Sequence, residues 1–483
     1  MTNEILIIGA GVVGCALARE LSRYTAEVTV LERGADVAEG ASKANSGIVH
    51  AGYDAQPGSM KARLNVEGAE MFGQMCRELG VPYRKNGAMV VAFHEEDIRT
   101  LRRLMDQAKA NGVRSGFMEQ EELRSLEPQV NPEAVAALLI PDSAITSPYE
   151  LTYALADHAA LNGVRFCLGE EVRAVCLEDG CWHVTTSKAE YTCRVLINCA
   201  GADSALLHNQ MSPERRQVIH RRGQYYVLDH PRTLPFERTM FQCPTEMGKG
   251  VLVSPTVHGN VLLGPTAEDI PDALAVETTA EGLEEVLRTA RLTWPQAQVR
   301  TAVTTFSGVR AHETGDDFVI GAVKGAPHAY EALGIDSPGL SSAPAIARML
   351  GDQIAREEGL VRKVSWQMLP PRPKAFNEMT LEEQRAAVQA NPLNGNIICR
   401  CEVVTEAEIR DAIRRPVGAT SIDGVKRRTR AGMGRCQGGF CSPRVAEILA
   451  EELGVELLQV TKNGGHSTLL CGTIRDVMKE GKL

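Results

Sequence analysis

Residues 4–33 constrain the fold of this chain more than any other stretch. An apolar run leads into glycines at the spacing GxGxxG, a helical pattern follows, and a second apolar run ends in an acid. Such a β-turn-α-β unit holds a dinucleotide, because the glycines permit a tight turn, close approach of the backbone to the pyrophosphate, and close helix packing. The helix N-terminus attracts the phosphates and the acid binds ribose hydroxyls. The predicted cofactor contacts here are Gly9, Gly11, Gly14 and Glu32.

Length and charge narrow the class of protein. The 483 residues suffice for roughly two or three domains, and a net charge of −9 gives no support for nucleic-acid binding. No apolar run is long enough to cross a bilayer, and the glycine fingerprint lies too close to Met1 for a signal or transit peptide. We therefore expect a cytoplasmic protein that binds no nucleic acid. Peripheral membrane contact and oligomerisation stay open.

The order of helical and strand-like patterns predicts an α/β protein. Alternating helices and apolar strands in the first part indicate a Rossmann-like domain, and strand-like runs between turns over residues 217–320 indicate an inserted antiparallel sheet that covers the substrate. Proline-rich residues 368–373 form the best linker. The predicted division is a discontinuous nucleotide-binding domain (1–80, 145–205 and 330–365), a substrate domain (81–144 and 206–329), a linker (366–396) and a small, mainly helical module with a C-terminal tail (397–483).

Three further loops are candidate walls of the nucleotide site. Residues 41–52 are small and polar, so they can pass close to a cofactor without steric conflict. Gly201 stands at the exit of a predicted strand, where ligands of doubly wound sheets sit. Gly334 and Gly339 bracket a loop that leads to a helix N-terminus, where backbone amides stabilise negative charge.

Four of the thirteen cysteines form two close pairs near the C-terminus. A disulfide framework is not expected in the cytosol, and the scattered cysteines are predicted to be small buried side chains. Four thiolates suit a 2Fe-2S cluster, whereas the C-x-C and C-x4-C spacings differ from the C-x2-C pairs of most structural zinc sites. Zinc remains the alternative. The predicted ligands are Cys399, Cys401, Cys436 and Cys441.

Basic residues are concentrated around this quartet. We expect them to stabilise a negatively charged cluster and raise its potential, or to form a soluble surface or a docking face for a partner. They are Lys426, Arg427, Arg428, Arg430, Arg435 and Arg444.

Several motifs beside the fingerprint carry a family resemblance. Residues 45–52 (NSGIVHAG), 57–63 (PGSMKAR), 222–226 (RGQYY) and 307–310 (SGVR) resemble the glycine/D-amino-acid oxidase (DAO) superfamily of FAD-dependent oxidoreductases, and most closely its L-2-hydroxyglutarate oxidase group. The cysteine module resembles the bacterioferritin-associated-ferredoxin-like (BFD-like) 2Fe-2S domain, which also occurs on anaerobic-type glycerol-3-phosphate dehydrogenase subunits. The resemblance implies two cofactors, FAD and a 2Fe-2S cluster.

The resemblance also implies the FAD contacts. Because only one dinucleotide fingerprint is present, we expect a small molecule to reduce the flavin directly; nicotinamide in this site is the alternative, and the 334–342 loop favours FAD. Beyond the fingerprint, the implied contacts are Arg33, Ser42, Asn45 and Ser46 in the first loop, Val172 and Gly201 beside the adenosine, and Gly339, Leu340 and Ser341 near the isoalloxazine ring.

Oxidation of a carbon by hydride transfer needs a base and a cation that binds the substrate's anionic end. His50, in the small-residue loop, is the first candidate base. The resemblance makes Arg310 the cation that binds a carboxylate or phosphate, and His312 is a second candidate base. Weaker substrate-site candidates are Tyr225, Tyr226 and Lys249.

The leading hypothesis is an FAD-dependent dehydrogenase that oxidises a small anionic hydroxy compound, either L-2-hydroxyglutarate or glycerol 3-phosphate. Electrons would leave singly through the 2Fe-2S cluster to a partner flavoprotein or another acceptor. Two alternatives use the same architecture. One is a dehydrogenase of amino acids or amines, and the other is an electron-transfer subunit without a substrate of its own.

Overall fold

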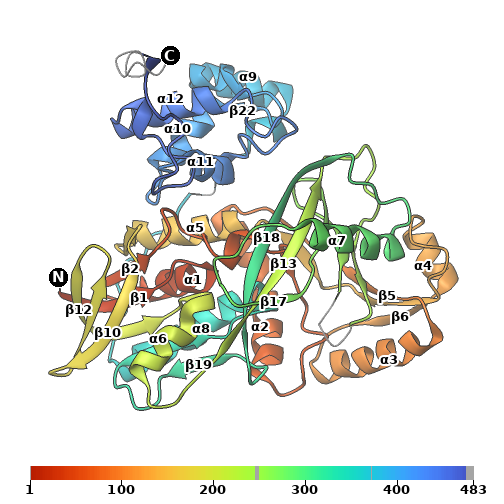
Figure 1. The fold of residues 1–483 in the computed structure, drawn as a ribbon, viewed down its shortest axis with the longest axis horizontal. Helices are drawn as coiled ribbons and strands as arrows, with labels where there is room; N and C mark the ends of the chain where they lie inside the picture. Colours follow the sequence, from red (N-terminus) through yellow and green to blue (C-terminus); the bar gives the residue numbers. More distant parts are fainter. Residues whose placement is uncertain (1, 245–249, 371, 475–483) are drawn as a thin grey trace.

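Two large sheets and a small helical module make up the computed structural model, which describes residues 2–244, 250–370 and 372–474 (Figure 1). The first sheet has the strand order β10-β11-β12-β1-β2-β9, with β20 added beside β12 and β19 beside β20. The strands β1, β2, β9, β12 and β20 pair in parallel, and β10, β11 and β19 pair antiparallel. Their bounds are β1 Thr2–Ile8, β2 Val28–Glu32, β9 Arg165–Leu168, β10 Val172–Glu178, β11 Cys181–Thr186, β12 Glu190–Asn198, β19 Val319–Ala322 and β20 Ala329–Leu333.

Successive side chains of β1 point to opposite faces of this sheet, and both faces are buried. Ile5 and Ile7 belong to a core shared with the helices α1 (Val12–Leu21), α2 (Met60–Leu79), α5 (Pro148–Leu161) and α8 (Gly339–Glu357). Leu6 and Ile8 belong to a second core, which is covered by β10, β11 and α6 (Ser204–Met211). This is the two-sided burial expected of a doubly wound sheet, and it fixes the carboxyl end of β1 at the centre of the domain.

The second sheet has the order β17-β13-β16-β15-β14-β5-β7-β6, with the long strand β18 paired to β13. Its pairs are antiparallel except for β14 with β5. Two short helices, α3 (Glu95–Ala110) and α7 (Ala280–Thr293), pack on it, and α4 (Gln120–Leu126) lies at one end (Figure 1). The strands are β5 Ala88–Ala92, β6 Gly116–Glu119, β7 Ala136–Ile140, β13 Val218–Leu228, β14 Thr239–Gln242, β15 Leu252–Pro255, β16 Val261–Gly264, β17 Glu268–Ile270 and β18 Ala302–Glu313.

A three-stranded sheet connects these two parts. It has the order β3-β8-β4, with β3 at Ile48–Val49, β8 at Ala144–Thr146 and β4 at Tyr83–Arg84. The strand β3 lies in the small-residue loop predicted to meet the cofactor, so the sheet fixes this loop against the start of α5.

The structure confirms the α/β fold with an inserted, mostly antiparallel sheet, and it differs from the sequence-based interpretation at two places. The sequence pattern predicts a helix over residues 345–357, whereas α8 begins earlier, at Gly339, and contains Pro344. Burial of its serine-rich first turn outweighs the weak helix propensity of these residues. The segment that returns to the first sheet starts with β19 rather than near Tyr330, because β19 forms an antiparallel pair with β20.

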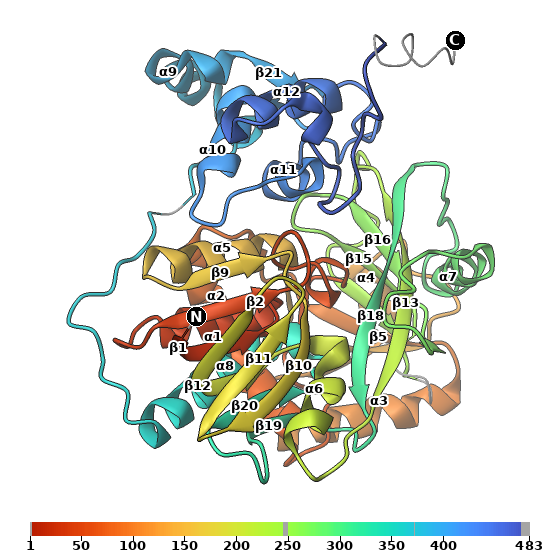
Figure 2. The same ribbon diagram turned by 60° about the vertical axis from the view of Figure 1, so that its left-hand side comes forward.

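The C-terminal module is mainly helical, as expected. Its helices α10 (Glu406–Arg414), α11 (Ile422–Thr429) and α12 (Ser442–Leu453) enclose a small core, beside a hairpin of β21 (Ile397–Cys399) and β22 (Val404–Thr405). Figure 2 shows the linker rising along the side of the first domain to α9 (Leu381–Ala390), with α11 facing α5. No helix in the described part of the chain is long and apolar enough to cross a membrane.

Candidate active site

A cavity of about 1450 Å³ lies where the carboxyl ends of β1, β2 and β12 meet β18 and the start of α8. Small-molecule sites are commonly about 300–1,000 Å³, so this cavity has room for a dinucleotide together with a substrate. Most of the residues proposed from the sequence line it: Gly9, Gly11, Glu32, Arg33, Ser42, Asn45, Ser46, His50, Gly201, Arg310, His312, Gly339, Leu340 and Ser341.

The fingerprint glycines allow close packing at which a side chain would clash. Gly9 has a φ of +102°, and a Cβ built on it would lie 2.4 Å from the carbonyl oxygen of Cys199. A Cβ on Gly14 would lie 2.0 Å from the carbonyl oxygen of Gly9. Gly11 caps α1, and both Gly11 and the first residues of α1 line the cavity, so the positive end of this helix faces the cavity. This arrangement suits a pyrophosphate.

Glu32 is held rigidly at the end of β2. Its carboxylate accepts hydrogen bonds from the amides of Ala10 (2.8 Å) and Gly34 (2.7 Å). Burial raises the pKa of Glu32, while these two amides oppose the shift. The neighbouring Arg33 pairs with Asp203 at 2.6 Å. A fixed acceptor in this position matches the ribose-binding acid of dinucleotide folds.

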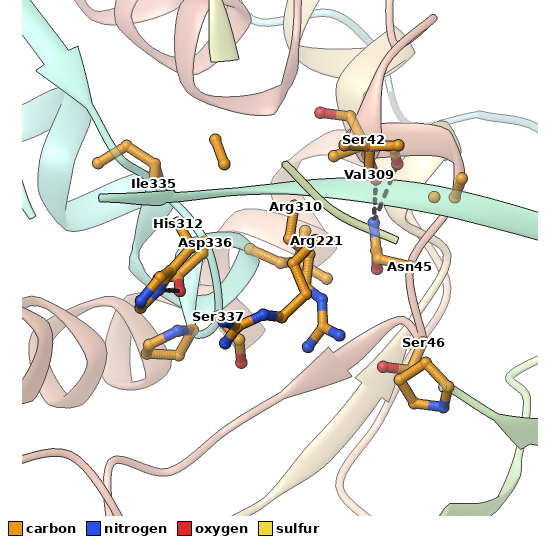
Figure 3. Close-up of a pocket in the computed structure, with 18 of the residues that line it drawn as sticks. Ser42, Asn45, Ser46, Arg221, Val309, Arg310, His312, Ile335, Asp336 and Ser337 are labelled. Carbon is orange, nitrogen blue, oxygen red and sulfur yellow. Dashed lines mark hydrogen bonds and ion pairs between the residues drawn. The ribbon is translucent and has the colours of Figure 1, made fainter. Parts of the chain in front are cut away.

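The loop after β2 is folded tightly on itself (Figure 3). The Asn45 side chain donates to the carbonyl oxygens of Ala41 (3.0 Å) and Ser42 (3.2 Å), and it accepts from the Gly47 amide at 2.9 Å. The Ser42 hydroxyl accepts from the Val12 amide at 2.8 Å, which joins the loop to the first turn of α1. These hydrogen bonds hold the loop in one shape.

The start of α8 forms the opposite wall. The buried Ser341 hydroxyl accepts from the His50 amide at 3.1 Å and donates to the Pro338 carbonyl at 3.3 Å. The buried His50 ring lies 5.7 Å from the Phe241 ring, centroid to centroid. His50 is thus placed in the cavity wall by contacts from helix α8 and from strand β14 of the second sheet.

Three proposed cofactor residues do not line the cavity. Gly14 lies within α1 and serves the close packing described above. Val172 begins β10 and pairs with Thr186. Gly334 has a φ of +69°, and its Cβ would lie 2.4 Å from that of Glu313, so it allows a close approach to β18.

Two arginines extend side by side into the cavity from paired strands (Figure 3). Arg221 of β13 lies opposite Arg310 of β18 in the strand register. Arg221 binds Asp269 through two hydrogen bonds, of 2.6 and 3.1 Å. Arg310 donates to the carbonyl oxygen of Thr266 at 3.2 Å. These two guanidinium groups place two cations at one end of the cavity, and Arg221 is already paired with an acid.

A lysine and a histidine share one carboxylate beside these arginines. Asp336 lies 2.9 Å from Nδ1 of His312 and 3.0 Å from Nζ of Lys61. Sequence reasoning missed Lys61, Arg221 and Asp336 as site residues. Lys61 stands inside the PGSMKAR motif, so a sequence signal was present for it. Arg221 reaches the site through the pairing of β13 with β18, and Asp336 reaches it because the chain returns to the first sheet.

The weaker substrate-site candidates differ in whether they line the cavity. Tyr225 is buried, lines the cavity and stacks on Phe306 with centroids 4.6 Å apart. Tyr226 packs against the core of the second sheet instead. Lys249 lies outside the described residues.

The four module cysteines form two close pairs of thiols. Cys401 Sγ lies 3.8 Å from Cys436 Sγ. Tetrahedral metal–sulfur bonds of about 2.3 Å place two thiolates roughly 3.8 Å apart, so this pair fits one metal ion. The Cys441 thiol donates to Cys399 and, with nearby backbone amides, lowers the pKa of Cys399 to about 6. The same contact raises the pKa of Cys441.

Backbone amides also lower the pKa of Cys436, most of all the amide of Phe440. Amides aimed at sulfur suit thiolates that hold a cluster. In the described part of the chain no three His, Cys, Asp or Glu side chains converge as a preformed site for one ion. Two separate thiol pairs fit a two-iron cluster better than a mononuclear zinc site.

The basic residues near the quartet bind acids in different parts of the chain and do not form one continuous basic surface. Arg428 pairs with Asp36 and Arg427 with Glu39, both in the first domain, and Arg430 pairs with Glu402. Arg444 binds module acids, and Arg435 pairs with Asp229 of the second sheet. The expectation that this cluster of cations forms a free docking face is therefore wrong for Arg427 and Arg428, which are buried against the first domain.

Comparisons with known families agree with both the dinucleotide cavity and the cysteine module. The family of FAD dependent oxidoreductases (DAO) matches residues 4–353, and the BFD-like 2Fe-2S binding domain matches residues 397–451. A solved structure, the dithionite-reduced L-alpha-glycerophosphate oxidase of Mycoplasma pneumoniae with FAD bound, has a TM-score of 0.73 and 32% identity. That match covers 77% of this chain and 100% of the oxidase. The glycine oxidase of Geobacillus kaustophilus shares the fold, with a TM-score of 0.68 and 20% identity over 76% of this chain and 97% of the oxidase.

One curated relative extends the similarity to the cysteine module. A glycerol 3-phosphate dehydrogenase of Caloramator mitchellensis is 43% identical over 97% of this chain and 98% of its own length. A mitochondrial L-2-hydroxyglutarate dehydrogenase of Arabidopsis thaliana is 28% identical over 73% of this chain and 83% of its own. The chain therefore belongs to the DAO family of FAD-dependent oxidoreductases, binds FAD, and carries a BFD-like 2Fe-2S domain.

Proposed function

We propose that this enzyme oxidises the secondary alcohol of glycerol 3-phosphate to a ketone and passes the electrons through its 2Fe-2S cluster to an external acceptor. The observation that carries the proposal is the relative named for glycerol 3-phosphate, which matches nearly the whole chain, cysteine module included. The oxidation removes two electrons and two protons from the substrate. Bound FAD supplies the acceptor for the hydride.

The two cavity arginines are the proposed phosphate site. Arg310 lies opposite Arg221, and a guanidinium fork matches two phosphate oxygens. The fork of Arg221 is bound to Asp269, whereas within the described residues Arg310 donates to one backbone carbonyl. Arg310 therefore has more donors to offer a substrate. Lys61, tied to Asp336, adds positive charge at the same end of the cavity.

His50 is the proposed base. Its backbone bond to Ser341 and its contact with Phe241 fix the loop, so the imidazole can take the proton of the substrate hydroxyl while the carbon loses its hydride. His312 is the second candidate. Its Nδ1 is bound to Asp336, which orients the ring and leaves Nε2 as the nitrogen that would take the proton.

One contact between the cysteine module and the first domain lies close to a predicted cluster ligand. The Tyr149 hydroxyl, in the first turn of α5, contacts Met433 Sδ at 3.8 Å, on the loop that carries Cys436. We propose that electrons cross here and leave singly from the cluster to a partner redox protein.

We also propose the domain division given by the sequence, except that the segment returning to the first sheet starts at β19.

L-2-hydroxyglutarate is the second candidate substrate. The relatives named for it are more distant and match mainly the flavoprotein part of the chain. Its carboxylates could use the same two arginines. The amino-acid-oxidising structures are under 25% identical, so they support only the fold.

Anaerobic addition of candidate substrates to the isolated chain tests the proposal, with the flavin absorbance as the readout. We expect glycerol 3-phosphate to bleach the flavin at lower concentration than L-2-hydroxyglutarate. The reverse order would favour the second candidate, bleaching by an amino acid alone would overturn both, and no bleaching without a partner would favour an electron-transfer subunit.

A further inference from the structure

The cysteine module rests on the loop that forms the nucleotide end of the FAD cavity. This loop, residues 33–43, follows Glu32 and includes cavity-lining residues such as Arg33, Glu39 and Ser42. Its contacts with the module come from α11 and from the turn at residues 461–468. The loop is thus part of the cavity wall and also part of the interface with the cysteine module.

The central contact is a buried ion pair. Arg428 donates to both carboxylate oxygens of Asp36, at 2.5 and 2.7 Å, and the two side chains are only 1% and 3% exposed. The Arg428 guanidinium also lies 3.9 Å from the centre of the Tyr153 ring of α5. Burial disfavours the charge of Arg428, but the bond to Asp36 outweighs it and raises the pKa of Arg428. Removing either partner would leave the other charge buried and unpaired.

A second contact reaches a residue of the cavity itself. Arg427 binds the Glu39 carboxylate and donates to the Tyr153 hydroxyl at 2.6 Å. The Asn463 amide donates to the other Glu39 oxygen at 3.3 Å. Glu39 also pairs with Lys43 of its own loop. The module therefore sets the position of a cavity-wall side chain from outside the flavoprotein domain.

A smaller cavity of about 690 Å³ lies along the same seam. Its wall combines Arg33, Gly34 and Glu39 with Asn463 and Gly464 of the module. The first three residues also line the main cavity, so the two cavities are adjacent. Gly464 packs so closely that a Cβ on it would lie 2.0 Å from that of Ala35. The module thus contributes wall to the smaller cavity, which adjoins the nucleotide end of the main one.

We propose that Arg427 and Arg428 are positioning residues for FAD: through Asp36 and Glu39 they hold the 33–43 loop in its cofactor-binding shape, so module docking and FAD binding strengthen each other. The coupling is reciprocal, because a contact that raises FAD affinity is itself stabilised when FAD binds. The inference does not depend on which substrate the enzyme oxidises.

The first test is titration of FAD into apoprotein, followed by flavin fluorescence, with Arg428→Gln compared with wild type. We expect the Kd for FAD to rise about 5- to 150-fold, the range of typical couplings between sites. Arg414→Gln is the matched control, because Arg414 pairs with Glu452 inside the module. Its Kd should equal that of wild type. Arg428→Gln that folds, retains iron and sulfide, and binds FAD as wild type does would overturn the proposal.

The second test uses only the wild-type chain, so it holds even if Arg428→Gln fails to fold. Hydrogen exchange is measured on apoprotein before and after FAD is added. We expect slower exchange in α11 and residues 461–468, with little change in α12, whose packing is within the module. Unchanged exchange in α11, or equal slowing throughout the module, would contradict the coupling.

Discussion

Replacing Arg310 by methionine tests the proposed phosphate site most sharply. Methionine keeps an apolar stem and removes the guanidinium. In the described part of the chain, Arg310 donates one hydrogen bond, to the Thr266 carbonyl, and its loss should lower the free energy of unfolding by only about 1 kcal/mol. Arg221 remains bound to Asp269 and keeps one cation in the cavity.

The expected kinetic effect follows from the charge-assisted bond that is lost. Hydrogen bonds to charged groups contribute about 1.5–3 kcal/mol. At about 1.4 kcal/mol for each factor of ten, the KM for glycerol 3-phosphate should rise roughly 10- to 150-fold. Arg310→Lys should fall between wild type and Arg310→Met, because an ammonium keeps the charge but loses the planar fork.

The assay is steady-state oxidation of glycerol 3-phosphate with a dye acceptor, on protein with full FAD and iron content. Arg221→Met is the comparison variant and should raise KM less, since its fork is already bound to Asp269. An unchanged KM for Arg310→Met, or a larger effect from Arg221→Met, would refute the assignment of Arg310 as the main phosphate contact.

Three further predictions concern the cluster, the fingerprint and pH. Cys401→Ser should lose iron and acid-labile sulfide while its flavin is still bleached by substrate; retention of a full cluster would remove Cys401 from the ligand set. Gly14→Ala, whose Cβ would lie 2.0 Å from Gly9 O, should yield little FAD-loaded protein. Gly116→Ala is the control: its Cβ would lie in open space, so its free energy of unfolding should change by no more than about 0.5 kcal/mol. Equal yields of FAD-loaded protein from the two variants would contradict this prediction. Burial and the charge of Arg19 lower the pKa of His158 to about 4, so the unfolded chain gains a proton near pH 6.5 before the folded one does. Stability should therefore fall by up to about 3 kcal/mol as pH drops from 6.5 to 4. Urea unfolding of wild type and His158→Gln measures this, and an identical pH dependence in both would exclude His158 as the cause.

Local features of this fold follow directly from sequence. Ser59 and Gly80 bound α2 as cap residues, and the fingerprint forms the expected strand, turn and helix. These signals are short-range, because each depends on the conformation of a few adjacent residues. The same holds for the cysteine spacing, which indicates a cluster without knowledge of the fold.

The missed parts of the site depend on long-range geometry. Arg221 matters because β13 pairs with β18 in the register that places it opposite Arg310. Asp336 joins Lys61 to His312 only after the chain has returned to the first sheet. The docking of Arg428 on Asp36 was likewise hidden, since a run of cations has the same sequence whether it faces solvent or a buried acid.

The central claim is that electrons pass from glycerol 3-phosphate to the flavin and then into the cysteine-bound cluster of the same chain. Anaerobic mixing of the isolated enzyme with glycerol 3-phosphate, followed by optical and electron paramagnetic resonance spectroscopy, measures both centres. We predict a bleached flavin and the signal of a reduced 2Fe-2S cluster, with Cys401→Ser giving the bleaching alone. A flavin that stays oxidised, or a bleached flavin beside a fully oxidised cluster, would contradict the account.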